Sequence, residues 1–145
     1  MIFDTTTLFS DAQAITATAP STNTIDLLAT GRVYGAAADL VKDVGKGNPL
    51  KVQIQVVESF NTLTSLTITV QCDDNDGFSS AKNVIAQTIP LAELVAGKTA
   101  SIMSLPAGVD ERYVRLNYTV GGSNPTLGKI TAGLVVASQT NSVDF

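Results

Sequence analysis

The residues of this sequence that could do chemistry are few, and most of them cluster in one acidic stretch. Asp73–Asp76 supplies three aspartates and one asparagine directly before Gly77. Clustered carboxylate and amide oxygens are the ligands that Ca²⁺ prefers. An EF-hand loop, however, spaces its ligands on alternate positions and ends in a Glu, and Val84 stands where that Glu would fall. The stretch therefore predicts a solvated acidic turn, with a cation site as the alternative.

The sequence also lacks the usual groups of an active site. It contains no histidine, which removes the commonest general base near neutral pH and the Ser-His-Asp triad. Its single cysteine, Cys72, alternates with Leu66, Ile68 and Val70, so we expect it to face the core as a small, inert hydrophobe. We predict that the protein is not an enzyme and that it uses no cofactor or metal.

Charge and composition exclude further classes of protein. Nine Lys and Arg residues are scattered along the chain against thirteen Asp and Glu residues, for a net charge of −4. A nucleic-acid-binding protein would show a basic stripe instead. One cysteine cannot form an internal disulfide, and the chain shows neither a signal peptide nor an apolar run of membrane-spanning length. We expect synthesis in a reducing cytoplasm and no nucleic-acid or membrane partner.

The elements that must position these residues are strands. In several segments apolar residues alternate strictly with Thr, Gln and other polar residues, which is typical of half-buried antiparallel strands. Turn residues such as Asp76-Gly77 separate these segments. Helix is expected for only one or two turns, at Leu91–Ala96 and Gly35–Val41. The expected strands are Lys51–Val56, Leu66–Cys72, Tyr113–Val120 and Ile130–Val136, with weaker ones at Val84–Ile89 and Thr99–Met103.

Many short strands without a long helix predict an all-β fold. We expect residues 1–145 to form a single domain, a jelly-roll-like antiparallel β-sandwich with at most one or two short helical turns. Alternation alone does not separate this fold from an immunoglobulin-like sandwich. The absence of Trp and of paired cysteines argues against a true immunoglobulin domain.

Residues 1–30 carry isolated apolar side chains among Thr, Ala and Ser, and two interpretations stay open. They could form an edge strand followed by a loop, or an extended N-terminal arm that packs on a neighbouring chain. In the second case Ile2, Phe3, Leu8 and Phe9 would be exposed in the isolated chain. We predict on this basis that deletion of residues 1–10 weakens contacts with neighbours more than it unfolds the domain.

Several stretches, taken in order, resemble the small cement or decoration proteins of tailed-phage capsids, typified by the cement protein of a Bordetella podophage. The segment Val33–Leu40 is bulkier than this family pattern. Each stretch by itself is typical of strands and turns in general, so the resemblance depends on the joint presence of all the stretches over most of the chain. The stretches are Met1–Asp4, Phe9–Ala19, Ser21–Leu27, Lys42–Leu50, Asp73–Ala81, Arg112–Gly122 and Lys129–Leu134.

The resemblance implies a jelly roll without catalysis, bound to the outside of the virion capsid, where it cements neighbouring major capsid protein subunits. It also implies a homo-oligomer, a dimer being favoured and a trimer being the alternative. A lectin-like or receptor-binding β-sandwich module of a virion tail or spike is the competing function. Arg115 should face outward, where it could meet capsid acids or simply face solvent. Our candidate interface residues are Ile2, Phe3, Leu8, Phe9, Arg112 and Arg115.

Overall fold

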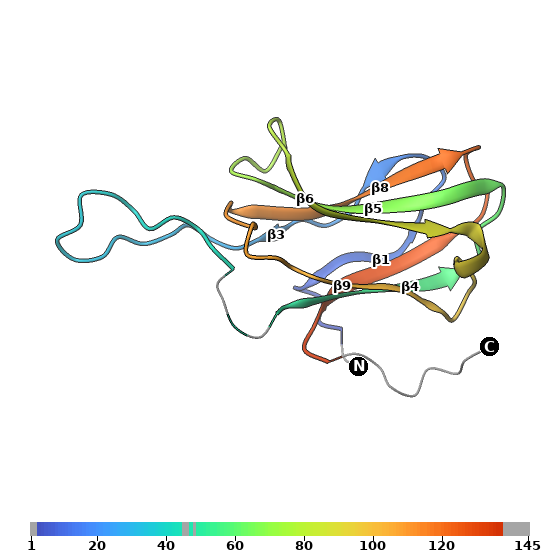
Figure 1. The fold of residues 1–145 in the computed structure, drawn as a ribbon, viewed down its shortest axis with the longest axis horizontal. Helices are drawn as coiled ribbons and strands as arrows, with labels where there is room; N and C mark the ends of the chain where they lie inside the picture. The colour runs from blue at the N-terminus through green and yellow to red at the C-terminus, as the bar shows by residue number, and fades with distance from the viewer. Residues whose placement is uncertain (1–2, 45–46, 48, 138–145) are drawn as a thin grey trace.

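The chain folds into two antiparallel β-sheets that pack face to face (Figure 1). This computed structural model describes residues 3–44, 47 and 49–137. The first sheet has the order β1 (Leu8–Ala14), β9 (Lys129–Val135), β4 (Lys51–Glu58) and β7 (Thr99–Ser104). The second has the order β2 (Ala19–Pro20), β8 (Tyr113–Gly122), β5 (Leu63–Asp73) and β6 (Lys82–Pro90), and β3 (Ile25–Asp26) also pairs with β8.

The order of the strands is that of a jelly roll. β2 pairs with β8 near Tyr118 and β3 pairs with it at Val114, so the two act as pieces of one interrupted strand. Counted this way, each sheet has four strand positions, and every connection except the one from β5 to β6 passes between the sheets, as in a double Greek key. The predicted all-β sandwich is confirmed.

The core is built by the alternating residues that the sequence singled out. Val52, Ile54 and Val56 of β4 are fully buried, as are the apolar residues of β5 that include Cys72. Tyr118 of β8 is also fully buried, and its hydroxyl lies 2.7 Å from the Ser10 hydroxyl of β1. Side chains from both sheets therefore fill one continuous interior, which makes the sandwich a rigid body.

The N-terminal residues belong to this body. Phe9 is fully buried in the core, while Leu8, which alternates with it, is buried on the opposite face of the first sheet. A Cβ placed on Gly133 would lie 3.0 Å from Leu8 Cδ2 and 3.1 Å from Phe3 Cδ1, so these side chains pack where β9 carries no side chain. The exposure of Leu8 and Phe9 that the arm interpretation predicted is therefore wrong, because β1 is an edge strand, as the other interpretation had it, and its side chains are covered by their own chain.

Helix is confined to one short turn in the part of the chain that is described. The 3₁₀ turn η1 (Leu91–Glu93) follows Pro90 and closes with a hydrogen bond from Leu94 N to Leu91 O. The helical turn expected at Gly35–Val41 is wrong: that segment is fully exposed, so a helix there would have no core on which to bury a face. None of the described residues forms a helix long and apolar enough to cross a membrane.

Candidate functional site

The two arginines among the candidate interface residues are both engaged within the chain. Arg115 lies on the outer face of the second sheet, where its Nε donates to Gln71 Oε1 at 2.9 Å and its guanidinium lies 4.0 Å from the centre of the Phe78 ring. Burial lowers the pKa of Arg115. Arg112 forms a two-pronged ion pair with Asp26, described below. Ile2 lies outside the described residues.

The acidic stretch Asp73–Asp76 forms a turn that uses its own carboxylates. Asp73 is fully buried, and it accepts hydrogen bonds from Asn75 N at 3.0 Å and from Ser80 N at 2.8 Å. Burial acts to raise the pKa of Asp73, but these backbone hydrogen bonds and the side-chain ones, such as that from the Ser80 hydroxyl, together outweigh it and the pKa is lowered. The Asp73 carboxylate therefore holds the turn between β5 and β6 in shape.

The described residues show no arrangement of ligands for a metal ion. No group of three or more Asp, Glu or Cys side chains among them is placed to hold one. Cys72 is fully buried, as predicted, and burial raises the pKa of its thiol. Burial likewise raises the pKa of the Tyr118 hydroxyl above its usual range. The groups most able to react are therefore held in the core in their neutral forms.

The most unusual surface of the molecule is a long segment between β3 and β4. Residues 28–42, here called the projection, leave one end of the sandwich and extend away from it (Figure 1, blue to cyan). Every residue from 31 to 41 is exposed. The projection carries large apolar side chains that solvent surrounds: Leu28, Val33, Tyr34, Leu40 and Val41. Apolar side chains gathered in this way on a surface usually mark a site of interaction with another molecule.

The tip of the projection is held together by its own contacts. Leu40 N donates to Gly31 O at 3.0 Å, which joins the outgoing limb to the returning one. An ion pair between Arg32 and Asp39, at 2.9 Å, spans the same two limbs. Beyond this pair the residues from Val33 to Ala38 carry no charge. The tip is thus a narrow loop with an uncharged end, and Tyr34 is its only aromatic side chain.

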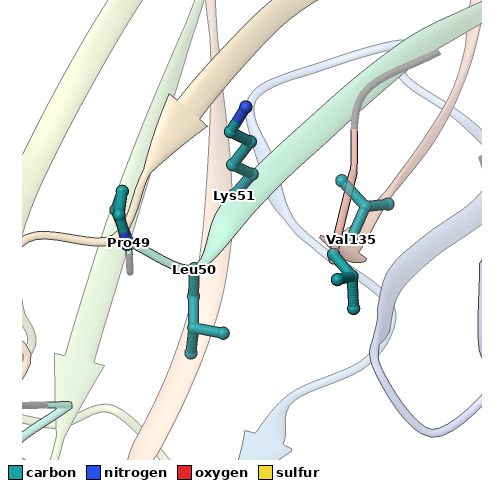
Figure 2. A pocket seen from close by; sticks show the side chains of 5 residues that line it. Pro49, Leu50, Lys51 and Val135 are labelled. Carbon is teal, nitrogen blue, oxygen red and sulfur yellow. The ribbon is translucent and has the colours of Figure 1, made fainter. Parts of the chain in front are cut away.

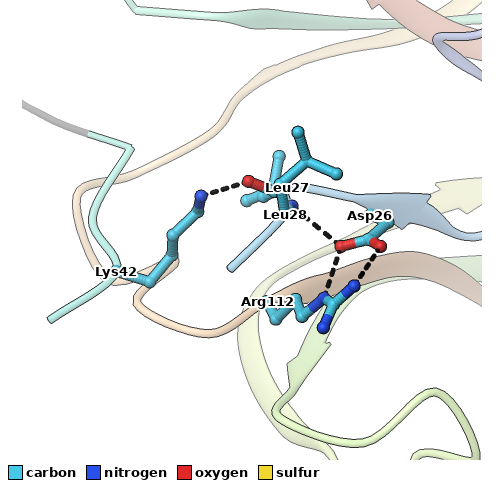
Figure 3. Close-up of polar contacts among 5 residues, drawn as sticks. All are labelled: Asp26, Leu27, Leu28, Lys42 and Arg112. Atoms are coloured by element: carbon cyan, nitrogen blue, oxygen red, sulfur yellow. Dashed lines mark hydrogen bonds and ion pairs between the residues drawn. The ribbon is translucent and has the colours of Figure 1, made fainter. Parts of the chain in front are cut away.

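The base of the projection is clamped to the sandwich by charged groups (Figure 3). Arg112 donates from Nε and Nη2 to the two carboxylate oxygens of Asp26, each at 2.8 Å. The same carboxylate accepts from Leu28 N at 2.8 Å. On the returning limb, Lys42 Nζ donates to Leu27 O. We call Asp26, Arg112 and Lys42, with the backbone of Leu27 and Leu28, the clamp.

The electrostatics of the clamp favour its ionised form. The hydrogen bonds from Arg112 lower the pKa of Asp26 to about 2 from the usual 3.8. Asp26 in turn raises the pKa of Arg112. A carboxyl group with a lowered pKa stabilises the folded arrangement above its ordinary pKa and loses that effect as the pH falls through the lowered value. The clamp is therefore closed at neutral pH.

A second apolar feature lies where the chain enters β4. Pro49, Leu50, Lys51, Val135 and Val136 line an open pocket of about 280 Å³ (Figure 2). Lys51 and Val135 are register partners on β4 and β9, so adjacent strands form the floor. Val136 is fully exposed and Leu50 is partly exposed. An apolar side chain from another molecule would find a partly desolvated surface here.

Sequence reasoning did not identify either the projection or the pocket as a site. The projection could have been found from the length of its segment, because residues 27–50 contain no strand pattern. Loops longer than about 12–15 residues are usually functional or disordered. For the pocket no sequence signal was present, because its walls come from strands that are far apart in the chain. The predicted interface residues Leu8 and Phe9 are buried in the sandwich, away from the projection and the pocket. Of the predicted interface residues, only Arg112 contributes to the projection, through the clamp.

Comparison with known proteins places the chain in a family. No curated protein matches it. A family model, that of Bbp16, matches residues 9–135, which include every strand described above except Leu8, the first residue of β1. The match thus covers the sandwich, the projection and the pocket except for Val136. The chain belongs to the Bbp16 family, a Bordetella phage-related family, and is a phage protein.

Proposed function

We propose that the protein is a structural virion component that binds the outer surface of the phage capsid and cements neighbouring major capsid protein subunits. The observation that carries the proposal is the projection, a segment with exposed apolar side chains that is clamped to a rigid sandwich. In an isolated chain these side chains have no partner within the sandwich. Such exposed side chains fit a protein that holds neighbouring subunits together. The protein would be made in the host cytoplasm and would then reside on the exterior of the virion.

The body of the protein suits the same work. Its core is continuous across both sheets, so a force on the projection is borne by the whole packed domain. A cement protein meets many equivalent neighbours on a symmetric shell. Each further contact to that shell becomes intramolecular, so weak contacts add to a high avidity. The proposal therefore needs no large single interface, and it assigns no catalytic step to the protein.

The experiment that tests the proposal is co-sedimentation with undecorated phage heads. Purified protein is titrated against a fixed amount of heads, the heads are pelleted, and the bound fraction is measured. We expect saturable binding. A variant with Tyr34→Ser and Val41→Ser, both exposed on the projection, should bind at least about tenfold more weakly, since each 1.4 kcal/mol of lost contact is tenfold.

A matched control separates the projection from exposed apolar residues in general. Val57→Ser removes an exposed apolar side chain from β4 of the sandwich, and it should bind heads like the unmodified protein. Failure of the unmodified protein to sediment with heads would overturn the proposal. Binding to isolated glycans or to tails would then favour the receptor-binding alternative.

A further inference from the structure

We infer that the pocket at the start of β4 binds a segment of its own chain, residues 138–145, here called the tail. The tail follows the part of the chain that the structure describes. In this arrangement the apolar side chains of Val143 and Phe145 fill the pocket, and the carboxylate of Asp144 pairs with Lys51 at its rim. The inference goes beyond the proposed function and does not depend on it.

The pocket combines an apolar lining with a single cation. Pro49, Leu50, Val135 and Val136 line it, and Lys51 is the only charged residue beside them. Figure 2 shows the side chains of Leu50 and Lys51 leaving the chain in opposite directions, so the ammonium lies at the rim of the pocket. Among the described residues, Lys51 takes part in no ion pair. The pocket therefore suits an apolar group that carries a carboxylate next to it.

The tail has this chemistry. Its only charged residue is Asp144, which stands between Val143 and Phe145, and every other residue of the tail is Ser, Thr, Asn or Gln. In an extended segment successive side chains point in opposite directions. The two apolar side chains therefore share one side and the carboxylate lies on the other. The same segment can thus fill the apolar lining and reach the ammonium of Lys51, which also attracts an aromatic ring.

The tail begins beside the pocket. Val136 lines the pocket, and only Ala137 separates it from the tail. Asn141 and Ser142, which favour turns, precede the apolar pair. Residues 137–142 span roughly 20 Å when extended, which is enough for the chain to reverse and return to the pocket. Because the tail is tethered, its effective concentration at the pocket is high, and weak contacts are enough to hold it.

The size and exposure of the pocket favour such an occupant over a free small molecule. Its volume of about 280 Å³ lies below the roughly 300–1,000 Å³ that is usual for small-molecule sites. It also leaves Val136 fully exposed and Leu50 partly exposed. A docked tail removes both side chains from water, which is favourable in proportion to the apolar area that it covers. The projection then remains as the main exposed apolar surface of the described chain.

Nuclear Overhauser spectroscopy of the intact, isotope-labelled protein tests the inference. We expect cross-peaks between the ring protons of Phe145 and the methyl groups of Leu50 or Val136. Phe145→Ser should abolish these cross-peaks and shift the same methyl signals, because the ring current is lost. Tyr34→Ser is the matched control. It removes the exposed aromatic side chain of the projection and should leave the methyl signals of the pocket unchanged.

Each outcome decides the inference. Cross-peaks within one copy, measured on labelled protein diluted into unlabelled protein, support it. Cross-peaks that arise only between copies would overturn it by placing the tail on a neighbour. A response of the pocket signals to Tyr34→Ser would overturn it by placing the projection there, and so would the absence of any cross-peak from Phe145.

A further variant tests the ion pair by itself. Asp144→Asn removes the charge that faces Lys51 and should weaken the cross-peaks from the Phe145 ring without abolishing them, because exposed ion pairs contribute little. Unchanged intensities would overturn the pairing with Lys51. These measurements need no phage heads, so the inference can fail while co-sedimentation with heads succeeds, and the reverse.

Discussion

The sandwich and the projection differ in how they treat their apolar side chains: the sandwich buries them and the projection leaves them exposed. In the sandwich, apolar side chains such as Phe9 and Ile54 are removed completely from water, and strand hydrogen bonds fix the backbone. In the projection, apolar side chains such as Tyr34 and Val41 remain in water. Its backbone is held by a clamp of charged groups at the base and by a few hydrogen bonds at the tip.

The difference separates stability from assembly. Ordering a residue costs roughly 1–2 kcal/mol of backbone entropy, which apolar burial normally offsets. The projection buries almost nothing in the isolated chain, so it adds little to the free energy of unfolding. Its apolar surface instead stays available for burial against a neighbour. Stability should therefore depend on the sandwich, and association on the projection.

The strongest way to test this division is to damage the core through β1. Phe9→Ala should lower the free energy of unfolding by about 3–5 kcal/mol, because it leaves a cavity in a fully buried site. Urea denaturation followed by circular dichroism measures the change. Val57→Ala, at an exposed position of β4, is the control and should stay within about 0.5 kcal/mol of the unmodified protein.

The same argument reverses our sequence-based expectation for residues 1–10. Their deletion removes three buried residues, Leu8, Phe9 and Ser10, and takes away part of the strand that pairs with β9. We now expect the truncated chain to unfold rather than to lose contacts alone. A folded truncated protein with unchanged melting temperature would show that β1 is dispensable and would contradict this reading of the fold.

Changes in the projection should have a much smaller effect on stability. The Tyr34→Ser and Val41→Ser variant should unfold within about 0.5 kcal/mol of the unmodified protein, since neither side chain is buried in the isolated chain. The same urea titration, run at a low protein concentration where association does not contribute, provides the measurement. A loss comparable to that of Phe9→Ala would mean that the projection packs on its own sandwich.

The smallest effect on stability is expected at the clamp, which is exposed but directs the projection. The pKa of Asp26 is about 2, so the clamp should hold at neutral pH and open only as the pH falls through that value. The NMR shift of the Leu28 amide, which donates to Asp26, should titrate with a midpoint near 2. A midpoint near the usual 3.8 would show that Arg112 does not hold the carboxylate.

Asp26→Asn supplies the matching variant for the clamp. It removes the charge that Arg112 binds while it keeps a side chain of similar size. We expect the titration of the Leu28 amide to disappear and the melting temperature to change little, because exposed ion pairs contribute little to stability. A large drop in melting temperature would place the clamp among the elements that hold the sandwich together.

The sequence predicted the parts of the fold that obey a simple period. The alternation in β4, β5 and β8 predicted their buried faces correctly, since one side chain in two must face the core of a sandwich. In β9 the prediction holds for Ile130 and Ala132 but is wrong at the end of the strand, where Val135 is buried and Val136 is exposed. The weaker strands at Val84–Ile89 and Thr99–Met103 are also present, as β6 and β7. The acidic residues of Asp73–Asp76 form the expected turn, although Asp73 is buried and not solvated as predicted.

Other features followed no period. β1 contains Ser10, Ala12 and Gln13 and is bulged, with shifts in its register against β9. Its apolar residues therefore did not alternate cleanly, and Leu8 and Phe9 were mistaken for exposed contacts. The three alanines of the projection indicated a helical turn by propensity, yet the segment has no partner surface to stabilise a helix.

By itself, the sequence determined that this is an all-β sandwich with a buried cysteine and without histidine, because composition and the two-residue period of a strand can be read from neighbouring residues. The tertiary structure alone decided where the contact surfaces lie. Asp26 reaches Arg112 across a long stretch of sequence, and Leu50 meets Val135 only because β4 pairs with β9. Clamp and pocket are products of strand pairing between distant segments, and no local pattern encodes such pairing.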